Sequence, residues 1–108
     1  MDDITTAGIR QLMSSTNDND WVLALTITKG IDSINAESII YDYIKEIHGT
    51  TIELGLFYDL KEFIKSNFDS LKIYTKFCME IQVAWPREWS SNLLIADVTR
   101  CGTLIYTP

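Results

Sequence analysis

The chain has 108 residues, of which 46% are hydrophobic and 22% are charged, a composition typical of a folded globular protein and unlike that of a disordered one. Its longest unbroken apolar run is the pentapeptide Trp21–Leu25, far short of the ~20 apolar residues that a membrane-spanning helix needs. Nine Lys and Arg against fifteen Asp and Glu give a net charge of −6. This charge argues against nucleic acid as the partner, because the main attraction there is to phosphate. At about one domain per 100–200 residues, residues 1–108 are expected to form a single domain.

The first residues and the cysteines together predict a cytoplasmic protein. Met1–Ile4 carries two acids where a signal peptide would be positively charged, and no apolar segment follows it. Cys78 and Cys101 are the two cysteines, and in the cytoplasm they are expected to stay reduced. With the single histidine, His48, they provide too few ligands at useful spacing for a metal site. Neither a metal nor a cofactor is therefore expected.

Three segments follow one another in the first quarter of the chain. Asp3–Ser14 places apolar residues at roughly helical spacing and is predicted to be a helix. The polar run Ser14–Asp20 is expected to be a loop. Trp21–Thr28 is apolar and partly β-branched, which favours a buried strand, although Asp20 could also cap a short helix there.

The clearest helix is predicted over residues 35–48. Asn35 is a favourable N-cap, Glu37 lies in the first turn, and Gly49 follows the last turn. At about 100° per residue, one side of this helix is apolar and the other is polar. The apolar side holds Ala36, Ile39, Ile40, Tyr43, Ile44 and Ile47, and the polar side holds Glu37, Ser38, Tyr41, Asp42, Lys45, Glu46 and His48.

Two structures compete directly after Gly49. Thr50 and Glu53 match a capping box that would start a helix, whereas the alternation of apolar residues over Thr51–Leu56 favours a short strand. A helical stripe then continues, and a helix is predicted over Asp59–Asn67.

A period of two dominates the next segment. From Leu71 to Trp85, apolar residues or threonine occupy every odd position, which predicts a long strand with a bulge or bend. Pro86 ends this strand, and a second apolar run extends from Leu93 to Arg100. A tight turn at Cys101-Gly102 would lead into a third strand over Thr103–Thr107.

These elements predict an α+β fold. N-terminal helices would pack on a C-terminal antiparallel β-meander of three strands. A strand near residues 21–28 could join the two parts.

No motif in the sequence identifies a reaction, and the chain is predicted not to be an enzyme. His48 lies in the last turn of the predicted helix, where a cation interacts favourably with the negative end of the helix dipole. Asp18–Asp20 resembles the start of a calcium loop, but the required Gly and Glu positions fall on Leu23 and Lys29. The five glycines are scattered singly, so the sequence contains no phosphate-binding loop.

The charge is distributed unevenly along the chain. Residues 1–60 contain ten acids and three bases, a net of −7, and residues 61–108 contain five acids and six bases, a net of +1. The whole negative excess therefore lies in the N-terminal part. It could serve solubility alone, or it could attract a basic protein partner.

The polar side of the 35–48 helix is the predicted binding surface. Tyr41 is expected to point away from the core, surrounded by Glu37, Asp42, Lys45 and Glu46. A tyrosine among carboxylates suits a binding hot spot for a basic partner. Trp89 is a second candidate for partner binding, because it lies in a predicted loop and could be exposed there or folded back over the sheet.

The combination of small size, acidity, no recognisable active site and a tyrosine among acids resembles bacterial toxin-immunity proteins, of the contact-dependent inhibition or nuclease-bacteriocin type. The segment Ile40–Tyr43 is similar to the tyrosine-and-acid helix of the immunity proteins of nuclease colicins. That resemblance covers four residues, and the predicted sheet-rich C-terminal part departs from that family. It implies that the chain neutralises a cognate toxin, often a basic nuclease, by covering its active site.

Three other functions fit the same sequence. The chain could mimic nucleic acid and inhibit a nucleic-acid enzyme as a phage or plasmid protein. It could be a structural or adaptor subunit that pairs through the uncharged strand Thr103–Thr107. It could also be a small enzyme whose site a single sequence does not reveal.

Overall fold

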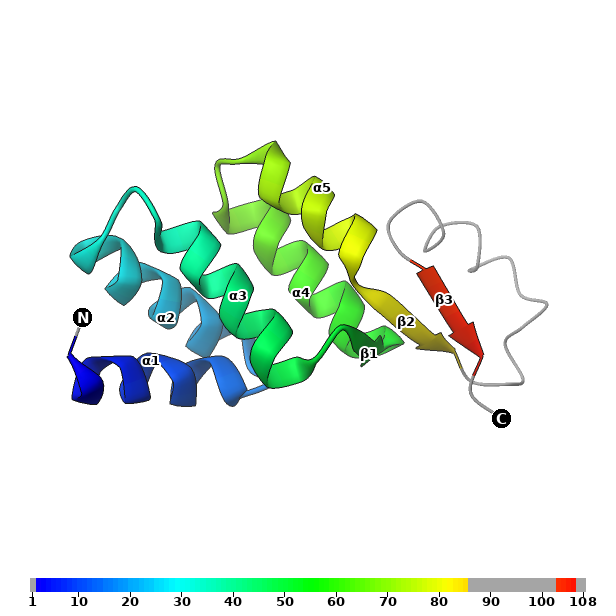
Figure 1. The fold of residues 1–108 in the computed structure, drawn as a ribbon, viewed down its shortest axis with the longest axis horizontal. Coiled ribbons are helices and arrows are strands. Elements are labelled where there is room, and N and C mark those ends of the chain that lie inside the picture. Colours follow the sequence, from blue (N-terminus) through cyan, green and yellow to red (C-terminus); the bar gives the residue numbers. More distant parts are fainter. Residues whose placement is uncertain (1, 86–102, 107–108) are drawn as a thin grey trace.

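The computed structural model describes residues 2–85 and 103–106. These residues form five helices and three strands, in the order α1 (Asp3–Ser14), α2 (Asp18–Ile31), α3 (Ala36–His48), β1 (Thr51–Glu53), α4 (Leu54–Asn67), α5 (Leu71–Glu80), β2 (Gln82–Trp85) and β3 (Thr103–Tyr106). Figure 1 shows the helices as a layered array, with the strands gathered at one end. The described part of the chain is mainly helical, so the expected α+β arrangement is wrong.

The small sheet is parallel, not antiparallel. Its strand order is β1-β2-β3, with Thr51 opposite Gln82 and Gln82 opposite Thr103. Parallel neighbours need a crossover connection, and α4 and α5 provide it between β1 and β2. The predicted third strand is confirmed over Thr103–Tyr106, but as a parallel neighbour of β2. The predicted run over residues 93–100 and the turn at residues 101–102 lie outside the described residues.

The long alternating strand predicted over residues 71–85 is wrong over most of its length. Leu71–Glu80 is helix α5, and only Gln82–Trp85 is a strand. Leu71 and Met79 are 81% and 74% exposed although both belong to the odd, apolar set. Phe77 and Cys78 are neighbours in the sequence and both are buried, which is possible on the inner side of a helix, whereas neighbours in a strand point to opposite faces. The alternation of residue types was therefore accidental, and burial follows the helical period.

The strand predicted near residues 21–28 is also wrong, because Asp18–Ile31 forms helix α2. The Asn17 side chain accepts a hydrogen bond from the Asn19 backbone N–H (2.9 Å), and Asp18 and Asp20 lie in the first turn. Both features stabilise a helix N-terminus. Apolar residues lie on the inner and the outer side of α2, so the run lacks the periodicity that separates a helix from a buried strand.

Several predicted elements are confirmed. The helices over Asp3–Ser14, 35–48 and Asp59–Asn67 correspond to α1, α3 and α4, and His48 lies in the last turn of α3. Gly49 ends α3 with φ +83° and ψ 178°, a backbone conformation essentially restricted to glycine. The capping box is wrong: Thr51–Glu53 is the competing strand, and Glu53 makes no side-chain cap bond to α4.

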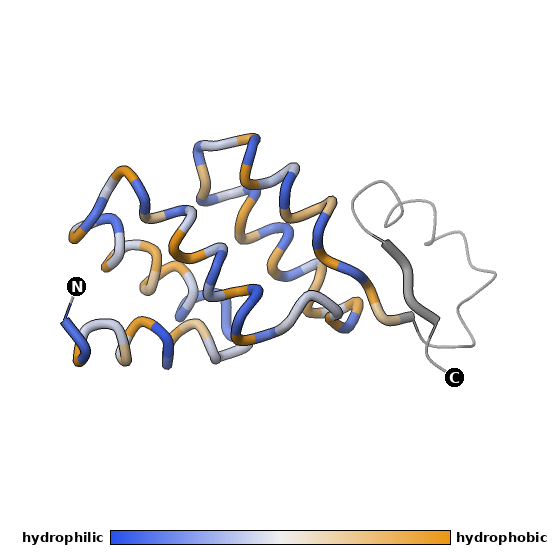
Figure 2. Tube along the Cα trace, viewed as in Figure 1, coloured by the Kyte–Doolittle hydropathy of each residue, from blue (hydrophilic) through white to orange (hydrophobic). Residues whose placement is uncertain are grey.

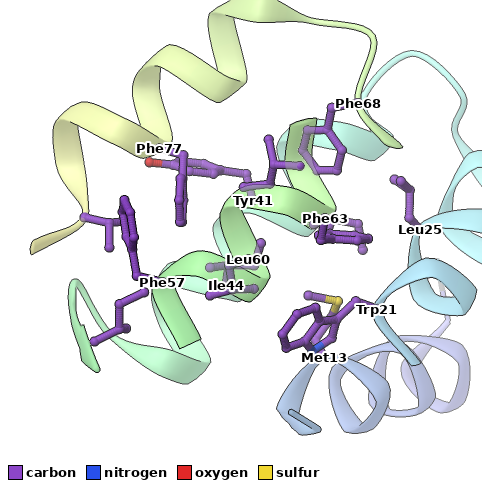
Figure 3. Packing of buried hydrophobic residues seen from close by; sticks show 14 of the residues in the cluster. Met13, Trp21, Leu25, Tyr41, Ile44, Phe57, Leu60, Phe63, Phe68 and Phe77 are labelled. Atoms are coloured by element: carbon purple, nitrogen blue, oxygen red, sulfur yellow. The ribbon is translucent and has the colours of Figure 1, made fainter. Parts of the chain in front are cut away.

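The core lies between the helices and is rich in aromatic rings (Figure 3). Phe57 and Phe77 stack with centroids 5.5 Å apart, which joins α4 to α5. Trp21 is fully buried, meets Phe63 edge to face at 5.8 Å, and donates its Nε1–H to the Ser15 carbonyl at 2.7 Å. These contacts unite α2, α4 and α5 around one apolar cluster.

Along the chain, Figure 2 shows hydrophilic residues at the start of α2 and hydrophobic residues along much of its remaining length. None of the described helices is both long enough and apolar enough to cross a bilayer.

Candidate functional site

Tyr41, the centre of the predicted binding surface, is buried between α3 and α5. Its side chain is 1% exposed, and Figure 3 shows it beside Phe77 and under α5. The phenol donates a hydrogen bond to Glu80 Oε2 (2.8 Å), which also accepts one from Lys45 Nζ (3.2 Å). Lys45 and Lys76 lie 5.0 and 5.4 Å from the centre of the Tyr41 ring, so both make cation–π contacts.

Burial is the main cause of a raised pKa for the Tyr41 phenol, and the Glu80 hydrogen bond adds to it. The same hydrogen bond, assisted by Lys45, lowers the pKa of the Glu80 carboxyl. At neutral pH the phenol therefore stays protonated, and its O–H donates a hydrogen bond to the charged Glu80 carboxylate. This arrangement links α3 to α5 and leaves no phenol surface for a partner.

The expected outward orientation of Tyr41 is wrong because α3 is covered on two sides. α1 and α2 pack on one side of α3, and α5 packs on another. The helical projection assigned a single buried face, and α5 was predicted to be a strand. The helix that covers Tyr41 was therefore missing from the prediction.

Two of the predicted acidic binding residues make contacts within the chain. Glu46 Oε2 pairs with Arg10 Nη1 at 2.9 Å, joining α3 to α1. Glu37 Oε1 accepts a hydrogen bond from the Asp69 backbone N–H at 2.8 Å. Asp42 is exposed on α3. The structure thus gives two members of the predicted group a partner within the chain and leaves Asp42 exposed.

The remaining sequence candidates are a tryptophan, the cysteines and a histidine. Trp89 and Cys101 lie outside the described residues. His48 Nε2–H donates to the Met13 carbonyl at 2.7 Å, and the His48 ring meets Trp21 edge to face, so His48 helps to hold α3 against α1 and α2. Within residues 2–85 and 103–106, no three His, Cys, Asp or Glu side chains form a group that could hold a metal ion.

A second acidic surface lies between α2 and α4. It is a hollow of about 170 Å³, here called the acidic hollow. Three carboxylates line it: Asp18 from the first turn of α2, and Asp59 and Glu62 from α4. All three residues are exposed, and none of the described lining residues carries a positive charge. Its remaining lining residues are Val22, Phe63, Ser66 and Asn67.

The acidic hollow can form ion pairs with lysine or arginine side chains. Carboxylates that share one side of a protein create a negative potential that reaches beyond contact distance. Val22 and Phe63 provide an apolar wall beside these carboxylates. The arrangement therefore suits a long basic side chain, whose methylene groups pack on apolar surface while its charge reaches an acid.

This surface is not predicted from the sequence, because the polar run Ser14–Asp20 that contains Asp18 is expected to be a loop. Asn17 followed by Asp18 and Asp20 is a helix-start pattern, since a cap is followed by acids in the first turn. Asp59 and Glu62 are three residues apart and therefore share one side of a helix. Their closeness to Asp18 depends on how α2 packs on α4, which no local pattern contains.

Comparisons with protein-family models, with curated proteins and with solved structures found no match to this chain.

Proposed function

We propose that this chain is a small acidic binding protein of the cytoplasm that neutralises a positively charged partner, and that the partner is a toxin domain. The observation that carries the proposal is the acidic hollow, where Asp18, Asp59 and Glu62 from two helices line one surface. The net charge of −7 over residues 1–60 supports the same conclusion. The proposal keeps the immunity-type function and moves the contact surface from α3 to α2 and α4.

The mechanism is occlusion assisted by electrostatic attraction. The negative N-terminal part speeds the approach of a cationic cleft, an effect that falls as salt screens the charges. On contact, the carboxylates of the hollow take the place that phosphates would occupy in a nuclease cleft. Tyr41 acts indirectly in this scheme, because it fixes α5 on α3 and makes no contact with the partner.

The first experiment is co-purification with the product of the adjacent gene. The tagged chain is co-expressed with that protein and washed at low and high salt. We expect a stoichiometric complex that weakens at high salt, and toxicity when the neighbour is expressed alone. A harmless neighbour that does not bind would contradict the toxin-neutralising function.

The second experiment tests the surface by charge removal. Asp59→Asn with Glu62→Gln removes two charges from the acidic hollow, and Asp42→Asn with Glu53→Gln removes two exposed charges elsewhere. Both pairs change the net charge equally. We expect the first pair to slow association several-fold more than the second at low salt. Equal effects of the two pairs would show that the hollow acts only through the net charge of the chain and is not the contact surface.

A further inference from the structure

The outer side of α2 carries an apolar surface that α1, α3 and α4 leave exposed. Four residues form it, here called the α2 face: Val22, Leu23, Ile27 and Ile31, with exposed fractions of 38%, 48%, 37% and 48%. Leu23, Ile27 and Ile31 follow one another at intervals of four residues, so they lie along one line of the helix. Lone exposed apolar side chains are ordinary, but a continuous row of them marks an interaction surface.

The composition of α2 separates this row from an ordinary solvated helix face. The inner side of the helix is already occupied by Trp21, Ala24, Leu25 and Thr28, all buried. Between residues 21 and 31 the one charged side chain is Lys29, and its ammonium group is half-buried and donates to the Asn67 carbonyl at 3.3 Å. The outer side therefore leaves apolar side chains partly exposed and has few of the charges that solvation would favour.

Carboxylates lie at both ends of the α2 face. Asp18 and Asp20 lie at its N-terminal end, and Asp32 follows its C-terminal end. Val22 belongs both to the α2 face and to the acidic hollow, so the apolar row continues into that hollow without a break. An apolar centre with a charged rim is the usual anatomy of a protein interface.

We infer that the α2 face is the docking surface for a basic protein segment that presents apolar side chains between lysines or arginines. This inference rests on the proposed function for the positive charge of the partner. The negative charge beside the α2 face favours a basic segment over a second copy of this chain as its occupant. Two α2 faces brought together would place their carboxylate rims close to each other, which is unfavourable, whereas a basic segment would pair with the rim.

The test uses a defined probe, an amphipathic helical peptide of about four turns built from leucine and lysine. It is added to the ¹⁵N-labelled chain at low salt, and backbone amide shifts are followed. We expect the largest shifts along α2 and over the part of α4 from Asp59 to Asn67, which lines the acidic hollow. The same titration at high salt should show weaker binding, because the rim contributes through charge.

Two pairs of uncharged substitutions test whether the peptide binds the α2 face or any exposed apolar surface. Leu23→Ser with Ile27→Ser removes two apolar side chains from the α2 face. Leu71→Ser with Met79→Ser is the matched control, because it removes two apolar side chains from α5 that are exposed to a greater extent. The serine variants lose the favourable burial of the exposed part of two apolar side chains. We therefore expect roughly tenfold weaker peptide binding for the first pair and little change for the second. Asp59→Asn with Glu62→Gln leaves the apolar row intact and should still weaken binding at low salt.

Three results would overturn the inference. Peptide-induced shifts on α5 instead of α2, or equal losses for the two serine pairs, would show that the α2 face is not special. Self-association of the chain alone that Ile27→Ser abolishes would assign the face to a second copy. The proposed function fails separately: a peptide that binds α2 while the adjacent gene's product does not would refute the toxin partner and leave the docking surface in place.

Discussion

Replacing Tyr41 by phenylalanine tests the contact that joins α3 to α5. The substitution removes one oxygen atom and keeps the buried ring, with its contacts to the ammonium groups of Lys45 and Lys76. What is lost is the 2.8 Å hydrogen bond to Glu80. Lys45 still reaches the same carboxylate oxygen, at 3.2 Å, so the charge of Glu80 is not left unpaired.

The magnitude follows from the exposure of the acceptor. A hydrogen bond to a charged group contributes about 1.5–3 kcal/mol, but the Glu80 side chain is 38% exposed, and water can replace part of the lost bond. We therefore expect Tyr41→Phe to reduce the free energy of unfolding by about 1 kcal/mol. For a chain of this size that is a shift of about 0.5–1 M in the urea midpoint.

The pH dependence has a definite sign. The pKa of Glu80 lies below its ordinary value because Tyr41, and after it Lys45, hydrogen-bond the carboxylate. The unfolded chain therefore binds more protons as the pH falls, and this part of the stability is lost between about pH 4.3 and the lower pKa of the folded state. In Tyr41→Phe the loss of stability over this pH window should be smaller.

The assay is urea unfolding at neutral pH and across the acid range, with Tyr58→Phe as the matched control, because Tyr58 is half-buried on α4. Glu80→Gln and the double variant complete a double-mutant cycle. A Tyr41→Phe effect below about 0.3 kcal/mol, with no coupling to Glu80, would be smaller than any buried hydrogen bond to a charge implies. That result would refute the role assigned to the contact.

Three further predictions concern the fold. Phe77→Ala removes the ring stacked on Phe57 and should lower the free energy of unfolding by about 3–5 kcal/mol. A loss below about 1 kcal/mol in chemical denaturation would argue against the packing of α5 on α4. Gly49→Ala forces a side chain into φ +83° with no steric contact within 4 Å and should cost about 1–3 kcal/mol; an unchanged melting temperature would show that the end of α3 rearranges. Glu46→Gln removes a solvent-exposed ion pair and should move the urea midpoint much less than Tyr41→Phe; an equal shift would mean that this pair stabilises the packing of α1 on α3.

Some ends of the helices depend on side chains that are close together in the sequence. Asp2 accepts a hydrogen bond from the Thr5 backbone N–H at 2.6 Å and begins α1, and Gly49 ends α3. Side chains close to each other in the chain create such caps, so their spacing is visible in the sequence, although the capping-box spacing of Thr50 and Glu53 does not produce a cap. The negative charge of the N-terminal part is likewise a property of the sequence.

The packing of one helix on another decides which surfaces remain exposed. Tyr41 is hidden because α5 packs on it, and the α5 sequence alternates in a way that predicts a strand. Asp18 joins Asp59 and Glu62 because α2 packs on α4. Helix propensity and amphipathicity are local, whereas burial depends on which helix lies on which face. The candidate docking surface belongs to this second kind of information, since it is the side of α2 on which packing leaves apolar side chains partly exposed.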